Sequence, residues 1–205
     1  MLEWIKNHKK RCFIIGGAIL LAITVLCVVL FVWGDDIANL GKPILTVETP
    51  QKLSVSETDI FSVDVTISAM GDALYPAASM RIAFDPSRLE FLGIREGNVF
   101  VLDETVSQAL PVWSCNADAC NETGYINVMY LDITGGRHAF SADLLAEEYN
   151  VVLRLNFRLR GSARAGDVYD LTVEDAVFAA SDEAQSLATA AETLRIRHGR
   201  IVIGE

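Results

Sequence analysis

The segment from Asn150 to Arg160, NVVLRLNFRLR, alternates apolar and polar side chains and most constrains how this chain can fold. In an extended strand, successive side chains point to opposite faces. One face would therefore carry Val151, Leu153, Leu155, Phe157 and Leu159. An amphipathic helix would instead repeat its apolar residues every three or four positions. The segment predicts an antiparallel strand with one buried face.

The same alternation recurs through residues 44–205. Residues 59–68 place Phe61, Val63, Val65 and Ile67 on one face. Further strands are predicted at residues 44–47, 79–84, 90–96, 110–114, 125–133, 169–179 and 194–203, with an interruption in the last near His198-Gly199. Helix signals are weak: residues 142–148 predict one or two turns, and residues 184–191 are predicted to lie in a loop. Many short strands with little helix predict an all-β sandwich of two sheets.

The N-terminal part is of a different kind. Residues 12–33, CFIIGGAILLAITVLCVVLFVW, contain no charged side chain. As a helix at ~1.5 Å per residue they would extend ~33 Å, enough for the hydrocarbon core of a bilayer. A cleavable signal peptide has a shorter apolar region of ~7–15 residues, so a transmembrane helix is the favoured interpretation.

The flanking charges predict the orientation of this helix. Lys6, Lys9, Lys10 and Arg11 precede the span, and Asp35-Asp36 follows it. The positive-inside rule then leaves the N-terminus in the cytoplasm. The predicted organisation is a basic cytoplasmic segment (1–11), a transmembrane helix (12–33), a linker (34–43) and an extracytoplasmic β-sandwich (44–205). The protein is thus expected to be a single-pass membrane protein.

The exported part is strongly acidic. Residues 35–205 carry 13 Lys and Arg against 26 Asp and Glu, a formal charge of −13. This charge argues against binding of nucleic acid, because a polyanion would be repelled. It names no other partner.

Two cysteines lie in the exported part, Cys115 and Cys120, within the polar segment CNADACNETG. Two thiols this close in an oxidising compartment favour a local disulfide, with free thiols or metal ligands as the alternatives. A metal site would need two more soft ligands nearby, and the sequence offers none. Asn121-Glu122-Thr123 is also a glycosylation sequon.

The sequence favours no enzymatic site. His8, His138 and His198 are far apart, and no serine lies in a nucleophile-elbow context. The acidic residues show no pairing typical of a general acid and base. The oxygen-rich segments near Asp182 and Asp118 lack the spacing of a calcium loop. We therefore predict a protein that is not an enzyme and that has no cofactor or metal of its own.

Residues 84–92, FDPSRLEFL, join two predicted strands by an Asp-Pro corner. This aromatic-Asp-Pro corner followed by Leu-Glu-Phe resembles the cohesin domain of cellulosome scaffolds and related bacterial surface proteins. In the same order follow segments similar to later strands of that family, at residues 151–167, 169–183 and 199–204. The resemblance covers roughly residues 44–204.

The resemblance implies a nine-stranded jelly-roll sandwich. It also implies binding of a dockerin, a small calcium-loaded helical module, through a face made by the third, fifth, sixth and eighth strands of the family. Matched by strand, the third is residues 77–85, with Met80, Ile82 and Phe84 inward. The residues then expected on the binding face are Ala77, Ser79, Arg81 and Ala83, with Val112 and Ser114 from the fifth strand and Val128, Tyr130 and Asp132 from the sixth.

The segment YINVMYLDI, residues 125–133, is apolar on both sides of a strand. A partner on its outer face would explain this, and Tyr is a favoured interface residue. A neighbouring loop covering the strand is the alternative, and the CNADAC segment is a candidate for that loop.

The favoured functional hypothesis is a membrane-anchored module that captures dockerin-bearing proteins, such as polysaccharide-degrading enzymes, at the cell surface. The first alternative is a carbohydrate-binding module of the same architecture. It would need an exposed aromatic platform, for which Trp113 is the one tryptophan in residues 44–205. The second alternative is self-assembly at the surface through sheet edges.

Overall fold

The computed structural model describes residues 41–48, 53–54, 60–99, 113–145, 150–161 and 163–204, together with Ile19, Ile23 and Thr24. The chain divides into two compact units, Met1–Gly41 and Lys42–Glu205. Among the described residues, no helix is long and apolar enough to cross a membrane. The span expected at residues 12–33 lies mostly outside them, so it stays a prediction.

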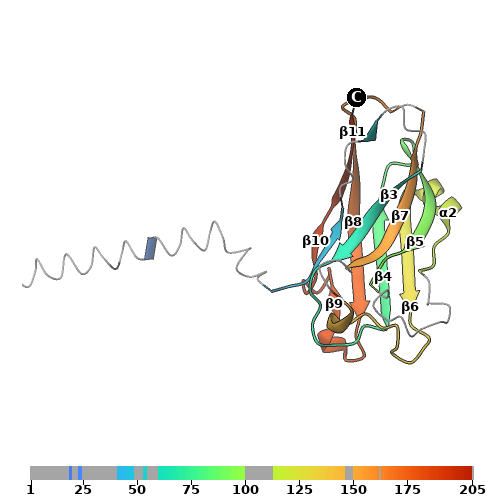
Figure 1. Ribbon diagram of the computed structural model, residues 1–205. Coiled ribbons are helices and arrows are strands. Elements are labelled where there is room, and N and C mark those ends of the chain that lie inside the picture. The colour runs from blue at the N-terminus through green and yellow to red at the C-terminus, as the bar shows by residue number, and fades with distance from the viewer. Residues whose placement is uncertain are drawn as a thin grey trace, which may run out of the picture. The chain divides into compact units, whose positions relative to one another are not determined.

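The second unit consists of two stacked sheets (Figure 1). The five-stranded sheet has the order β10 (Arg195–Arg197), β1 (Ile44–Val47), β3 (Phe61–Ile67), β7 (Val151–Leu159), β5 (Leu89–Glu96). The six-stranded sheet has the order β2 (Leu53–Ser54), β11 (Gly199–Gly204), β8 (Val168–Ala179), β4 (Ala77–Ala83), β6 (Tyr125–Leu131), and β9 (Leu187–Ala188) pairs with β8. The predicted all-β sandwich is confirmed.

The nine-strand count is too low for the part of the chain that is described, which contains eleven strands. Two of them, β2 and β9, have only two residues each. The predicted interruption at His198 is also confirmed. It separates β10, which pairs with β1, from β11, which pairs with β8, so the chain changes sheets there.

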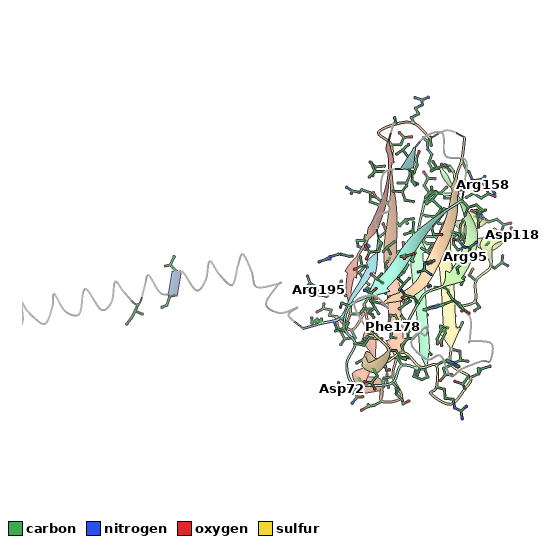
Figure 2. The ribbon with its side chains drawn as sticks, in the orientation of Figure 1. Asp72, Arg95, Asp118, Arg158, Phe178 and Arg195 are labelled. Carbon is green, nitrogen blue, oxygen red and sulfur yellow. The ribbon has the colours of Figure 1, made fainter. Side chains whose placement is uncertain are left out.

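The core lies between the sheets, where the alternating strands place their apolar side chains. Leu153, Leu155 and Phe157 of strand β7, which lies between β3 and β5, are fully buried, as the alternation predicts. The Phe157 ring lies 5.5–5.9 Å, between centroids, from the rings of Phe61, Phe84 and Phe91. In Figure 2, Phe178 lies between the layers while Arg158 points away from them.

The Asp85-Pro86 corner joins β4 to β5 as expected. The Asp85 carboxylate accepts hydrogen bonds from the Ser87 amide and hydroxyl, and the Asp85 carbonyl accepts from the amides of Arg88 and Leu89. The side-chain hydrogen bond from Ser87 is the main reason that the pKa of Asp85 is lowered. Because Pro86 has no amide hydrogen and a fixed φ, the turn ends β4 sharply.

In the described part of the sandwich, three short helices connect the strands: α2 (Ala117–Thr123), η1 (Ala142–Leu144) and η2 (Glu183–Gln185). Helix α2 replaces the polar loop expected there. Asn116 caps its first turn by accepting the Ala119 amide, and Gly124 ends it with a φ of 75°. Both residues are ordinary helix boundary signals, so the sequence did contain the information for this helix.

Candidate partner-binding face

The outer surface of β8, β4 and β6 forms one continuous face of the six-stranded sheet. At the edge of β6, Ser114 forms an antiparallel bridge with Met129 through hydrogen bonds of 2.8 and 3.1 Å. The order is therefore β8, β4, β6 and the segment at Ser114. The last three were matched above to the third, sixth and fifth strands of the family, and β8 overlaps residues 169–183, which are similar to a later strand of the family.

Strand β4 presents the residues expected from it. Met80, Ile82 and Phe84 are buried, and Ser79 and Arg81 are exposed. The expected outward residues Ala77 and Ala83 are half-buried at the two ends of the strand. The alternation between core and solvent in β4 is thus confirmed.

Strand β6 has the opposite orientation from the one expected. The predicted outward residues Val128 and Tyr130 are only 3% and 1% exposed, and both belong to the core. The Tyr130 ring packs against Trp113 and Phe140, and its hydroxyl donates to the His138 carbonyl at 2.6 Å. A buried hydroxyl needs such a partner, and the carbonyl inside the sandwich supplies it. Placing the strand from the following Gly-Gly turn was wrong by one residue, which reverses every side chain.

The residues of β6 that do face outward were missed by the sequence interpretation. They are Asn127, Met129 at 60% exposed and Leu131 at 57% exposed, and Ile133 beyond the strand is 81% exposed. Three large apolar side chains in one outward row are costly to leave in water and are typical of an interaction site. The apolar character of both faces was the available signal.

Asp132 was also expected on the face, but it is half-buried and serves a turn instead. Its carboxylate accepts hydrogen bonds from the Thr134 amide and hydroxyl and from the Gly136 amide, at 2.5–2.7 Å. Burial raises the pKa of Asp132, but these hydrogen bonds and the nearby His138 outweigh burial, and the pKa is lowered.

Strand β8 adds the third set of outward residues. A bulge opposite Arg81 and Ile82 leaves two successive residues, Glu174 and Asp175, both exposed. Beyond the bulge, Val177 and Ala179 continue the outward row. Bulges commonly redirect a side chain in this way. Without it, Asp175 would point into the core.

Cross-strand pairing divides the face into an apolar half and a polar half. Leu131, Ala77 and Ala179 form one row, and Met129, Ser79 and Val177 form the next. The following rows are polar or charged, with Asn127, Arg81 and Asp175, and then Tyr125, Ala83 and Thr172. Arg81 forms an ion pair with Glu174 at 3.1 Å, and its guanidinium lies 4.0 Å from the Tyr125 ring centroid.

The expected face residue Ser114 lies at the edge of β6, next to Met129. Ser114 is exposed and Val112 lies outside the described residues. A groove of about 490 Å³ crosses the face between its two halves, lined by Ser79, Met80, Arg81, Ser114, Cys115, Asn127, Val128, Met129 and Asp175.

The disulfide predicted between Cys115 and Cys120 is not formed, and both thiols are free. The first turn of α2 lies between them, and it buries Cys120 in the core while Cys115 stays half-buried. Burial, followed by the nearness of Cys120, raises the pKa of the Cys115 thiol. A raised pKa keeps this thiol protonated and poorly reactive near neutral pH.

The model of the cohesin domain family matches residues 46–195 of this sequence. The chain belongs to the cohesin family. No curated protein matches the sequence. Cohesins are protein-binding modules, which fits the expectation of a role other than catalysis.

Solved structures share the fold of this cohesin. One is the third cohesin of ScaC from Acetivibrio cellulolyticus, solved with the ScaB dockerin, with 16% identity, a TM-score of 0.55 and coverage of 80% of this chain and 99% of that one. A Clostridium thermocellum OlpA cohesin, solved with the dockerin Doc918, has 16% identity, a TM-score of 0.59 and the same coverages. A non-cellulosomal cohesin of the archaeon Archaeoglobus fulgidus has 13% identity, a TM-score of 0.53 and coverages of 80% and 93%.

Among the described residues, no group of three His, Cys, Asp or Glu side chains is arranged to hold a metal ion. The features that stand out are instead an outward apolar row, a charged half and a groove between them. Such a surface suits a folded protein partner better than a small substrate.

Proposed function

We propose that this cohesin binds a dockerin-type module through the outer face of β8, β4 and β6. The observation that carries the proposal is the exposed row of Met129 and Leu131 on β6 and Ile133 just beyond it. Several similar cohesin structures were solved in complex with dockerins, which supports this class of partner. Burial of this apolar row against a partner would supply the main driving force for association.

Matched substitutions at two exposed apolar positions test this proposal. Met129→Asp places a charge within the face, whereas Ile60→Asp places one at a similarly exposed residue next to the other sheet. Isothermal titration with a panel of dockerins should show that Met129→Asp weakens binding by more than about tenfold, as at an interface hot spot. Ile60→Asp should bind like the wild type. Equal effects of both substitutions, or no binding of any dockerin, would refute the proposal.

Tyr130→Phe distinguishes a role in core stability from a role in dockerin binding. The substitution removes the hydroxyl that donates to the buried His138 carbonyl, so we expect a loss of about 1–3 kcal/mol in the free energy of unfolding. Dockerin affinity should stay at the wild-type value, because Tyr130 lies beneath the face. Tyr130→Phe should thus lower stability and keep affinity, whereas Met129→Asp should lower affinity.

The carbohydrate-binding alternative has less support. Trp113 is buried, and its indole nitrogen donates to the Val152 carbonyl. The Tyr125 ring on the face is covered by the Arg81 guanidinium. Neither ring is therefore open for stacking on a sugar.

We further propose that residues 12–33 anchor the domain in a membrane, with residues 1–11 in the cytoplasm, and that the domain displays dockerin-bearing proteins, such as polysaccharide-degrading enzymes, outside the cell. The uncharged run and its flanking charges support this arrangement. The protein should stay in the membrane fraction after carbonate washing, and protease added to intact spheroplasts should digest the sandwich. Release by carbonate would contradict the anchor.

A further inference from the structure

The groove across the face runs from Asp175 on β8, past Ser79 and Arg81 on β4, to Met129 on β6 and Cys115 at the edge. It therefore lies between the apolar and polar halves. A partner side chain entering it would meet a carboxylate at one end and apolar atoms at the other.

Two charged side chains line the groove, those of Arg81 and Asp175. Strand β8 points three carboxylates outward, those of Asp170, Glu174 and Asp175. Asp170 pairs with Arg200 at 3.0 Å, and Glu174 pairs with Arg81 at 3.1 Å. Among the described residues, Asp175 forms no ion pair. Its carboxylate accepts one hydrogen bond, from the Thr189 hydroxyl.

Arg81 also lines the groove, but it is already held by two contacts. Its Nε lies 3.1 Å from the Glu174 carboxylate, and its guanidinium stacks on the Tyr125 ring. An incoming anion would have to displace Glu174 to pair with Arg81. An incoming cation finds Asp175 without an ion-pair partner.

The shape of the groove suits a long side chain. Ser79 is small, so it leaves space in the middle of the sheet between Met129 and Val177, its outward neighbours on both sides. The polarisable thioether of Met129 adapts to a packed alkyl chain. Lysine and arginine combine an apolar stem with a cationic end, which matches this order of surfaces.

We propose that the groove accepts a lysine or arginine side chain of the dockerin-type partner, with its cation bound to Asp175 and its stem packed over Ser79 against Met129. The proposal rests on the proposed function, because it specifies the chemistry of the partner at the same face. The β8 bulge is the structural device that makes it possible, since it turns Asp175 outward beside Glu174.

The test uses Asp175→Asn and the matched control Asp170→Asn in the full-length protein. Asparagine keeps an oxygen that accepts the Thr189 hydroxyl hydrogen bond but removes the charge. Asp170 has the same charge on the same strand, outside the groove. With a dockerin that binds the wild type, Asp175→Asn should raise Kd by about thirtyfold or more, mainly through faster dissociation, as for the loss of one member of a buried ion pair. Asp170→Asn should change Kd less than about threefold, as at an exposed pair.

A charge swap identifies the partner residue. Each lysine and arginine of that dockerin is changed to glutamate and tested against Asp175→Lys. One such combination should recover at least about tenfold of the affinity that each single change loses, because contacting residues show non-additive energies.

The outcomes separate this proposal from the proposed function. If no dockerin binds the wild type, both fail. If a dockerin binds and Met129→Asp weakens that binding, but Asp175→Asn and Asp170→Asn have the same effect on Kd, the proposed function stands. Only the proposal of a lysine or arginine bound to Asp175 is then wrong. If Asp175→Asn changes the oligomeric state of the free protein, a second copy occupies the groove, and the proposal is overturned.

Discussion

Asp132 shows how a single residue holds the end of β6 in place. Its carboxylate accepts three hydrogen bonds from Thr134 and Gly136, which close the turn at Gly135-Gly136. The outward orientation of Leu131 and Ile133 follows from where this turn begins. Asp132 therefore acts on the binding face through the backbone.

We expect the Asp132 carboxylate to make stability depend on pH. Its pKa is lowered in the folded state, so its contribution is fully present above the unfolded pKa of about 3.9 and is lost as pH falls through the lower folded pKa. Asp132→Asn should cost about 1–2 kcal/mol in the free energy of unfolding at pH 7, because hydrogen bonds to a charged acceptor are replaced by weaker ones. The difference from wild type should shrink below about pH 4. Thermal unfolding followed by circular dichroism at several pH values measures it.

Asp143 supplies the control for that experiment. It is exposed and forms no hydrogen bond or ion pair with the described part of the chain. Asp143→Asn should leave the unfolding temperature unchanged at every pH. A constant difference between Asp132→Asn and wild type from pH 7 to pH 3 would show that the charge of Asp132 is not what stabilises the turn.

At the scale of elements, the exposed edge of β5 is protected by a side chain. The Asn121 amide of helix α2 accepts the Phe91 amide at 2.9 Å and donates to the Phe91 carbonyl at 2.7 Å. It thus pairs with β5 as one residue of a neighbouring strand would. Unpaired strand edges invite association with other chains, and this amide blocks one such position.

Asn121→Asp should be strongly destabilising although the two side chains have the same shape. The Nδ2 group that donates to the carbonyls of Phe91 and Ala117 becomes a carboxylate oxygen. This oxygen cannot donate and would lie against two carbonyl oxygens, which are also acceptors. We expect a loss of about 2–4 kcal/mol, measured by urea unfolding. Asn116→Asp is the matched control, because Asn116 acts through its oxygen and aspartate is an equally good helix cap. Similar losses from both changes would contradict this role of Asn121.

How much of each element could be predicted depended on how clearly its two faces differ. Strand β4 has apolar residues on one side and small or charged ones on the other, so its outward residues followed directly from the sequence. Strand β6 is apolar on both sides, so the alternation gave no orientation. The contacts of Tyr130 with Trp113, Phe140 and the His138 carbonyl are what fix its inward orientation. Such contacts between separate segments cannot be read from the local alternation of one strand.

The outward position of Asp175 was beyond sequence reasoning for a related reason. With strict alternation along β8, either Glu174 or Asp175 would be exposed to solvent, but not both. The bulge that exposes both arises from pairing with β4 at Arg81 and Ile82. The predicted disulfide failed for a similar reason. The prediction assumed a loop between the two cysteines, whereas Asn116 and Gly124 bound a helix there.

At the scale of the whole molecule, strand β1 ties the start of the sandwich to its end. It pairs with β3 and with β10, and the Arg195 amide donates to the Pro43 carbonyl. Leu45 and Val47 are fully buried. Gly199 packs so closely against Val47 that a Cβ at position 199 would lie 2.4 Å from Val47 Cγ1. The sandwich is therefore expected to need β1 but nothing before it.

Two shortened chains test this requirement. A chain that begins at Gly41 retains the pairing of β1 with β3 and β10 and should unfold cooperatively in urea with the midpoint of the full-length protein. A chain that begins at Glu48 lacks Leu45 and Val47, and burial of two such side chains contributes about 3–6 kcal/mol. Because a domain is stable by only about 5–15 kcal/mol, that chain should be largely unfolded at mild urea concentrations. Equal midpoints for the two chains would mean that β1 is dispensable, and loss of cooperative unfolding in the longer one would mean that the sandwich depends on residues before Gly41.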